Sequence, residues 1–277
     1  MLGQRQEAAA AELAQWWDGI RQGGVGSHTV LLVGPAGWGR STVLDQLPQF
    51  IRAAGCPAGL EVRINGNSLP DEPGPQAAAV RESLLGPGIR QQAAALLYRS
   101  RLRGHRRLGT DRLLASGIAG TISLLRASLA TAAAGTVADD GPASQNGAAA
   151  RAARVVAAVS VSTPTLVIID DADELAPDLA VTVIENLIDG HDSKVLVAAG
   201  VEPGSDVAAA LLSRARNGLT AGRVHRARGD ARMGSQSRAE LIGELHPHLT
   251  EAEARELARQ TRTFAEIFAA ARPGALP

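Results

Sequence analysis

The hydrophobic positions of this chain follow two alternating patterns. Short continuous apolar runs are typical of strands buried on both faces of a parallel sheet, and longer segments with apolar residues three and four apart predict helices. Strands are predicted at 29–33, 60–66, 165–170, 194–200 and 223–227. Helices are predicted at 4–20, 41–54, 77–85, 90–107, 151–161, 177–189, 205–215, 237–245 and 250–270.

This alternation of strands and helices predicts an α/β fold in which helices cover both faces of a parallel sheet. The last two helices have no strand between them, which indicates a small helical lid. The second of them begins with Thr250 and Glu253, the spacing of a capping box. We therefore expect an N-terminal helix within 1–24, an α/β core at 25–222 and a lid at 223–277.

Two segments in the middle of the chain are harder to interpret. Residues 113–137 are apolar and about as long as a membrane span, but Arg126 lies in their middle. We interpret them as a buried or partner-facing helix and expect no membrane association. Residues 138–147 are rich in Gly, Asp, Asn and Ser, and this composition predicts a loop.

Composition narrows the class of protein. The chain has 277 residues and a formal net charge of zero, so no overall field attracts it to nucleic acid or membranes. Its single cysteine, Cys56, excludes an internal disulfide, and the start lacks a secretory signal pattern. Its basic residues are 27 arginines and one lysine, a bias typical of a GC-rich bacterial genome. We expect a cytoplasmic bacterial protein.

The most specific motif is VLLVGPAGWGRSTVLDQL, residues 30–47, which combines a strand, a glycine-rich turn and a helix start. Its spacing matches the phosphate-binding pattern G-x-x-x-x-G-K-[ST], in which backbone N–H groups surround phosphate oxygens. Ser41 is the expected Mg²⁺ ligand. The predicted nucleotide-binding residues are Gly34, Pro35, Ala36, Gly37, Trp38, Gly39, Arg40, Ser41 and Thr42.

The motif departs from its pattern at Arg40, where lysine is usual. Arginine keeps the positive charge, but its guanidinium is planar and longer than the compact ammonium of lysine. A misplacement of about 1 Å can cost on the order of 10²-fold in rate. We therefore expect nucleotide binding to be retained and hydrolysis to be slow.

The second motif is LVIIDDADEL, residues 166–175, a buried strand that ends in acids. Asp170 is the expected partner of Mg²⁺ or its waters, and Asp171 could polarise an attacking water. Glu174 could replace Asp171 in this role if the turn brings it inward. Residues 166–192 contain eight acids and no arginine or lysine, so a bound cation would relieve their repulsion.

Together, GPAGWGRST and LVIIDDADEL resemble the AAA+ and STAND branch of P-loop ATPases. The resemblance implies ATP or ADP with Mg²⁺ as ligands. The start of the chain is similar to the G-R-x-x-E box that helps to hold adenine in these proteins. Gly3 and Glu7 match this box, whereas Gln4 stands where arginine is usual.

Further segments resemble the same family and show where the chain departs from it. Residues 233–261 are similar to its helical lid. Ala199 and Gly200 lie where the family usually carries a sensor Asn or Arg, and Asp171 stands in place of the glutamate typical of AAA+ proteins. These departures favour nucleotide binding over fast turnover.

The resulting expectation is an ATP-binding switch module of a larger bacterial signalling or defence regulator. Self-association or protein partners would act through domains C-terminal to this chain. An active ATPase that remodels protein or nucleic acid and a nucleotide-free scaffold are the alternatives. The basic run at 99–107 fits either a nucleic-acid contact or a solvated helix face.

Overall fold

The computed structural model describes residues 4–57, 59–104, 142–190, 192–217, 223–227, 239–240, 242–243 and 249–261. Its centre is a five-stranded parallel sheet in the order β2-β3-β4-β1-β5. The strands are β1 (His28–Val33), β2 (Leu60–Asn65), β3 (Thr165–Asp170), β4 (Val195–Val201) and β5 (Val224–Arg226). The expected α/β fold is confirmed.

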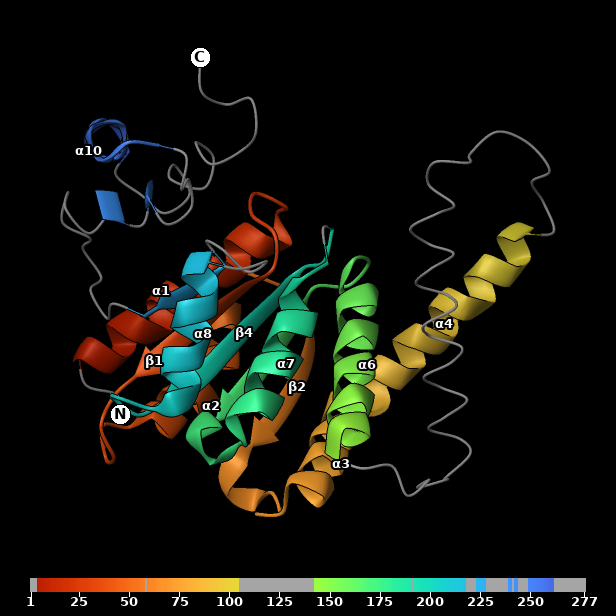
Figure 1. Cartoon of the computed structure of the whole chain (residues 1–277). Helices are drawn as coiled ribbons and strands as arrows, with labels where there is room; N and C mark the ends of the chain where they lie inside the picture. The colour runs from red at the N-terminus through yellow and green to blue at the C-terminus, as the bar shows by residue number, and fades with distance from the viewer. Residues whose placement is uncertain are drawn as a thin grey trace.

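Helices lie on both faces of the sheet (Figure 1). They are α1 (Gln4–Arg21), α2 (Arg40–Ala53), α3 (Pro73–Leu84), α4 (Pro87–Gly104), α6 (Pro142–Ser160), α7 (Pro177–Ile188), α8 (Asp206–Asn217) and α10 (Glu251–Gln260). Two short 3₁₀ turns, η1 (Gly66–Ser68) and η2 (Ala172–Glu174), follow β2 and β3. None of the described helices is long and apolar enough to cross a membrane.

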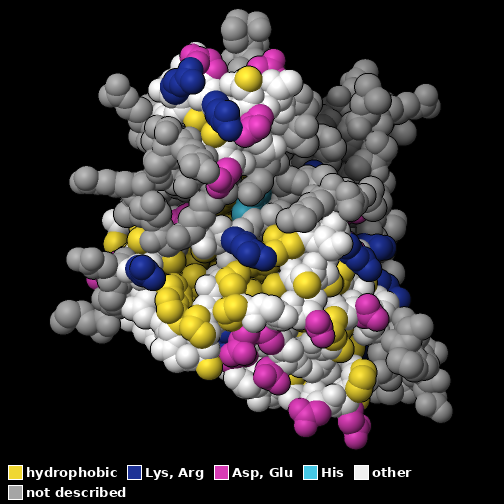
Figure 2. Space-filling view, turned by 60° about the vertical axis from the view of Figure 1, so that its left-hand side comes forward, with side chains coloured by type: hydrophobic (Ala, Val, Ile, Leu, Met, Phe, Trp, Pro, Cys, Tyr) yellow, Lys and Arg dark blue, Asp and Glu magenta, His cyan; other side chains and the backbone are white. Residues whose placement is uncertain are grey.

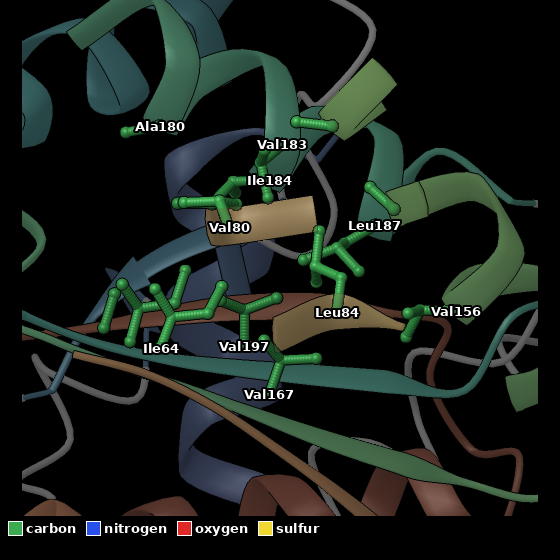
Figure 3. Close-up of a cluster of buried hydrophobic side chains, with 14 of the residues drawn as sticks. Ile64, Val80, Leu84, Val156, Val167, Ala180, Val183, Ile184, Leu187 and Val197 are labelled. Atoms are coloured by element: carbon green, nitrogen blue, oxygen red, sulfur yellow. The ribbon is translucent and has the colours of Figure 1, made fainter. Parts of the chain in front are cut away.

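The apolar strands pack on both faces because alternate residues point in opposite directions. Val30, Leu32 and Ile168 belong to a buried cluster with α1 and α2. Val167 and Val197 point to the other face, where Figure 3 shows them beneath side chains of α3, α6 and α7. A strand buried on two sides carries apolar residues on both of its faces, which explains why continuous apolar runs identified these strands.

The N-terminal helix α1 packs as its sequence pattern predicts. Its apolar side holds Leu13, Trp16, Trp17 and Ile20, and each of these is at most 1% exposed. Burial of two indole rings and two aliphatic side chains joins this helix to the cluster beneath the sheet. The helix is therefore part of the packed core.

One expected loop is wrong. Helix α6 extends back to Pro142, into the segment 138–147 that composition assigned to a loop. Proline is tolerated in the first turn of a helix, where its missing N–H has no intrahelical partner, and the alanines that follow favour helix. The apolar segment 113–137 lies outside the described residues.

The lid is described only in part. The capping box is confirmed, since Thr250 accepts a hydrogen bond from the Glu253 backbone and its own N–H donates to the Glu253 carboxylate at 2.8 Å. Ala254 and Ala258 of α10 are buried in the cluster that contains α1 and α2. Strand β5 pairs with β1 in the sheet. The domain boundaries of the expected scheme stay predictions.

A buried histidine pair gives the fold an expected pH dependence. His28 Nδ1 lies 3.1 Å from His225 Nε2, and the pair packs against Trp16. Burial lowers the pKa of His28 well below its ordinary value of 6.5, and electrostatic interaction with His225 and Arg223 acts in the same direction. Below pH 6.5, the unfolded chain therefore binds a proton at His28 that the native protein does not bind.

The contribution of His28 to the free energy of unfolding should therefore be fully present above pH 6.5 and decrease as the pH falls below it. Thermal unfolding followed between about pH 8 and pH 5 measures this slope. A His28→Phe variant keeps an aromatic ring but cannot titrate, and should show a flatter profile whatever its absolute stability. A profile parallel to that of the parent would contradict the assignment.

Candidate functional site

The candidate site lies where the carboxyl ends of the parallel strands meet. The glycine-rich loop follows β1, and Asp170 and Asp171 end β3. Strand β4 lies between these two strands, and Gly200 is paired with Leu32 of β1. In open parallel sheets, ligands bind at this edge of the sheet.

The loop has the backbone conformation that its glycines allow. Gly37 and Gly39 have φ values of 78° and 90°, which side chains rarely adopt. Gly34 packs against the Trp38 ring, since a Cβ there would lie 3.0 Å from it. Trp38 N–H donates to Pro35 O at 3.1 Å and closes the turn. The glycines of the motif therefore allow positive φ angles at two positions and close packing against the Trp38 ring at a third.

Helix α2 begins with unpaired backbone donors. Its N-cap is Gly39, which contributes no side-chain cap, and the first bond into the helix runs from Val43 N–H to Gly39 O at 3.0 Å. The N–H groups of Arg40, Ser41 and Thr42 precede that bond. Such a helix start carries partial positive charge and suits a phosphate.

The N-terminal segment that resembles an adenine box contacts the loop through Gln6, a residue that the sequence did not single out. The Gln6 side-chain amide of α1 donates to the Trp38 carbonyl. A Cβ at Gly39 would lie 2.8 Å from Gln6 Nε2, so a side chain at this position would displace the Gln6 amide. Glu7 is exposed, Gly3 lies outside the described residues, and the side chain of Gln4 is not described.

Arg40 is buried and is held by three groups from different strand ends. Its Nη1 donates to Gly34 O at 2.5 Å. Its Nη2 lies 3.4 Å from Asp171 Oδ1 and 3.4 Å from Glu202 Oε1. The guanidinium thus connects the loop after β1 with the acids after β3 and β4.

Ser41 and Asp170, the two predicted magnesium ligands, are brought together across β4. Ser41 Oγ donates to Asp170 Oδ1 at 3.1 Å. Asp170 Oδ1 also accepts from Asp171 N–H at 3.1 Å. Partial burial raises the pKa of Asp170, the Asp171 charge raises it further, and the Ser41 hydrogen bond opposes this shift. A divalent cation would favour the ionised form of this carboxyl group.

Asp171 has a strained backbone, and each of its carboxylate oxygens faces a side-chain donor. Its φ of 47° makes it the only non-glycine residue with positive φ among those described. Such conformations persist where surrounding structure enforces them, often at functional sites. Oδ1 faces Arg40, and Oδ2 accepts from Asn67 of η1. Each of the two oxygens that could polarise a water therefore already faces a side-chain donor.

The turn that carries Asp171 is fixed by two neighbours. Gly66 lies so close that a Cβ there would be 2.0 Å from Asp171 O. Gln76 of α3 is 3% exposed, donates to Glu174 O at 2.8 Å and accepts from Ala176 N–H at 2.9 Å. The Glu174 side chain is exposed. Its proposed role as a substitute for Asp171 stays a prediction.

Sequence spacing thus anticipated the loop and the two aspartates but missed the residues around them. Missed residues that contact the site or its turn are Gln6, Asn67, Gln76 and Glu202. The sequence contains one usable signal for two of them. Asn67 and Glu202 follow the ends of predicted strands, and parallel strands end at the same edge of the sheet.

Comparison with known proteins identifies a family for most of the chain. A family model described as an AAA ATPase domain matches residues 5–199, a range that contains Arg40, Ser41 and both aspartates. No curated protein and no solved structure matches the chain significantly.

Proposed function

Since the chain belongs to the AAA ATPase domain family, we propose that it is a nucleotide switch module that binds ATP or ADP with Mg²⁺ and hydrolyses ATP slowly. Membership in this family supports nucleotide binding. The STAND-type signalling or defence role, the bacterial and cytoplasmic setting and protein partners beyond this chain are proposed from the sequence resemblance.

The observation that carries the proposal is the pairing of Ser41 Oγ with Asp170 Oδ1 at 3.1 Å, beside the uncapped start of α2. The helix start can accept phosphate, and a hydroxyl and a carboxylate stand next to it. Mg²⁺ is usually held by one or two such protein groups together with phosphate oxygens and water. Ser41 and Asp170 fit this donor set, and the ion would neutralise phosphate charge.

We infer slow hydrolysis from the contacts that the Asp171 carboxylate makes with Arg40 and Asn67. A water that its carboxylate orients would have to share these oxygens with Arg40 and Asn67. Asp171 is also shorter than glutamate by one methylene group. Arg40 itself is hydrogen-bonded to Gly34 O and faces two carboxylates, so a transferring phosphoryl group would compete with them for the guanidinium. A guanidinium or carboxylate held away from its productive position slows turnover.

Nucleotide binding should raise the melting temperature. A ligand at 100 times its Kd that binds only the native state stabilises it by about 2.7 kcal/mol, or roughly 5–10 °C for a chain of this size. Differential scanning fluorimetry with Mg-ATP and Mg-ADP measures the shift. Ser41→Ala should reduce the part of the shift that EDTA removes. No shift at millimolar nucleotide would overturn the proposal and favour a nucleotide-free scaffold.

An active remodelling ATPase remains the second candidate, and steady-state phosphate release distinguishes it from a switch.

A nucleic-acid target would need a continuous basic surface. On the face shown in Figure 2, the described Lys and Arg side chains lie singly or in small groups, and acidic side chains gather beside them. The basic helix α4 is described to Gly104, and residues 105–107 of the basic run lie outside the described part.

A further inference from the structure

We propose that Glu202 is a positioning residue for Arg40: with Asp171, it holds the guanidinium in an ion pair that nucleotide phosphate must displace. This inference rests on the proposed nucleotide-binding function. It adds a residue outside both sequence motifs to the site. The ion pair limits the affinity of this arginine-containing loop for nucleotide.

The geometry places Glu202 and Asp171 on the same guanidinium nitrogen. Each carboxylate oxygen lies 3.4 Å from Arg40 Nη2, while Nη1 is used by Gly34 O. The Arg40 side chain is only 10% exposed, whereas that of Glu202 is 49% exposed. Glu202 can therefore be changed without opening the core, although it contacts a nearly buried cation.

The backbone of Glu202 is held in place independently of its side chain. Its N–H donates to Asp173 Oδ2, and its carbonyl accepts from Ser205 N–H at 3.2 Å. These bonds fix the turn after β4 beside the acidic turn after β3. The carboxylate is thus presented to Arg40 by a structured turn, and a substitution at its carboxyl group leaves these backbone bonds intact.

Gly200 lies beside Asp170 and the base of the Arg40 side chain. A Cβ at this position would lie 3.2 Å from Leu44 Cδ1, 3.4 Å from Asp170 Oδ1 and 3.7 Å from Arg40 Cβ. A longer side chain here would project between the arginine and the magnesium-binding acid. The glycine at this sensor-like position is therefore compatible with an arginine that crosses from the loop to the β4 turn.

Arginine suits this arrangement better than lysine. Its two terminal nitrogens can contact the Gly34 carbonyl and two carboxylates at the same time, because its donors form a planar fork. A lysine has one nitrogen at the end of a shorter side chain. We therefore infer that the arginine is matched to Glu202 and that both form part of one adapted site.

The pairing has a cost for the ligand. Asp171 and Glu202 both lie 3.4 Å from Arg40 Nη2, so an incoming polyphosphate must compete with two carboxylates for the same cation. Removing the Glu202 charge should free one donor of Arg40 and tighten nucleotide binding. A residue that merely supported the fold would weaken binding when changed.

The test compares Glu202→Gln with the parent by calorimetric titration of Mg-ADP. Because partly exposed ion pairs are weak, the expected gain in affinity is about two- to fivefold. The matched control is Glu185→Gln, which removes an equal charge from an exposed pair with Arg214. This control should bind as the parent does.

The same substitution in an Arg40→Lys background separates the ion pair from general repulsion. If Glu202 acts through the guanidinium, Glu202→Gln should give no gain there. A gain of equal size in both backgrounds, or weaker binding in the parent background, would overturn the proposal.

A double-mutant cycle without nucleotide distinguishes failure of the proposed ion pair from failure of the proposed function. It uses the parent, Glu202→Gln, Arg40→Lys and the double variant. Urea unfolding of the ligand-free proteins should show coupling between Arg40 and Glu202. If coupling is present but nucleotide never binds, the proposed function fails and the ion pair stands. If nucleotide binds but coupling is absent, Glu202 does not position Arg40.

Discussion

Replacing Arg40 with alanine should weaken Mg-ATP binding by about tenfold or more, since hydrogen bonds to charged groups contribute about 1.5–3 kcal/mol. Arg40 is the only cationic side chain in residues 34–42. Its loss also leaves Asp171 and Glu202 without their shared cation, so the repulsion of phosphate would increase. Calorimetric titration with Mg-ATP and Mg-ADP measures the effect.

The Arg40→Lys variant tests whether the site has adapted to arginine. If it has, lysine should bind nucleotide less well and should not raise hydrolysis, because one ammonium cannot reproduce the contacts of the guanidinium. If arginine only impairs a lysine site, hydrolysis should rise well above that of the parent.

Arg63→Ala, which removes an exposed arginine paired with Asp45 and Glu61, is the control. Its nucleotide affinity should equal that of the parent. Equal affinities in the parent and both Arg40 variants would show that Arg40 does not face the phosphates, and the assignment of the phosphate loop would fail.

Gly66→Ala is expected to destabilise the fold by about 2–4 kcal/mol, because over-packed positions force the backbone to shift. The new Cβ would lie 2.0 Å from Asp171 O and 3.0 Å from Asp171 C, which are backbone atoms that cannot rotate away. For a chain of this size, the melting temperature should fall by roughly 5–15 °C.

Gly86→Ala provides a matched control, since its Cβ would meet only Ser83 O at 3.5 Å, an ordinary contact. Its melting temperature should stay close to that of the parent. A Gly66→Ala protein as stable as this control would contradict the close approach of the turns after β2 and β3.

The fold was largely predictable because its sheet is buried on both faces. Strand β1 and strand β3 each contain four consecutive apolar residues, a pattern that local sequence shows directly. The start of α6 was mispredicted because composition favoured a loop at 138–147, where the structure has helix from Pro142 onward. The order of the strands cannot be read from such local patterns.

The candidate site was predictable only where its chemistry is local in sequence. The loop spacing identified residues 34–42, and the end of one strand identified Asp170 and Asp171. Contacts to these residues come from far along the chain. Asn67 lies 104 residues from Asp171, and Glu202 lies 162 residues from Arg40.

The sequence by itself therefore determined the α/β class, the phosphate-type loop, the acids of β3 and the substitution of arginine for lysine. Only the tertiary structure decided what that arginine contacts. The reason is physical: local spacing sets backbone conformation within a turn, whereas the partners of a buried charge depend on which strand ends the sheet places side by side. Strand β4, between β1 and β3, brings Glu202 to Arg40.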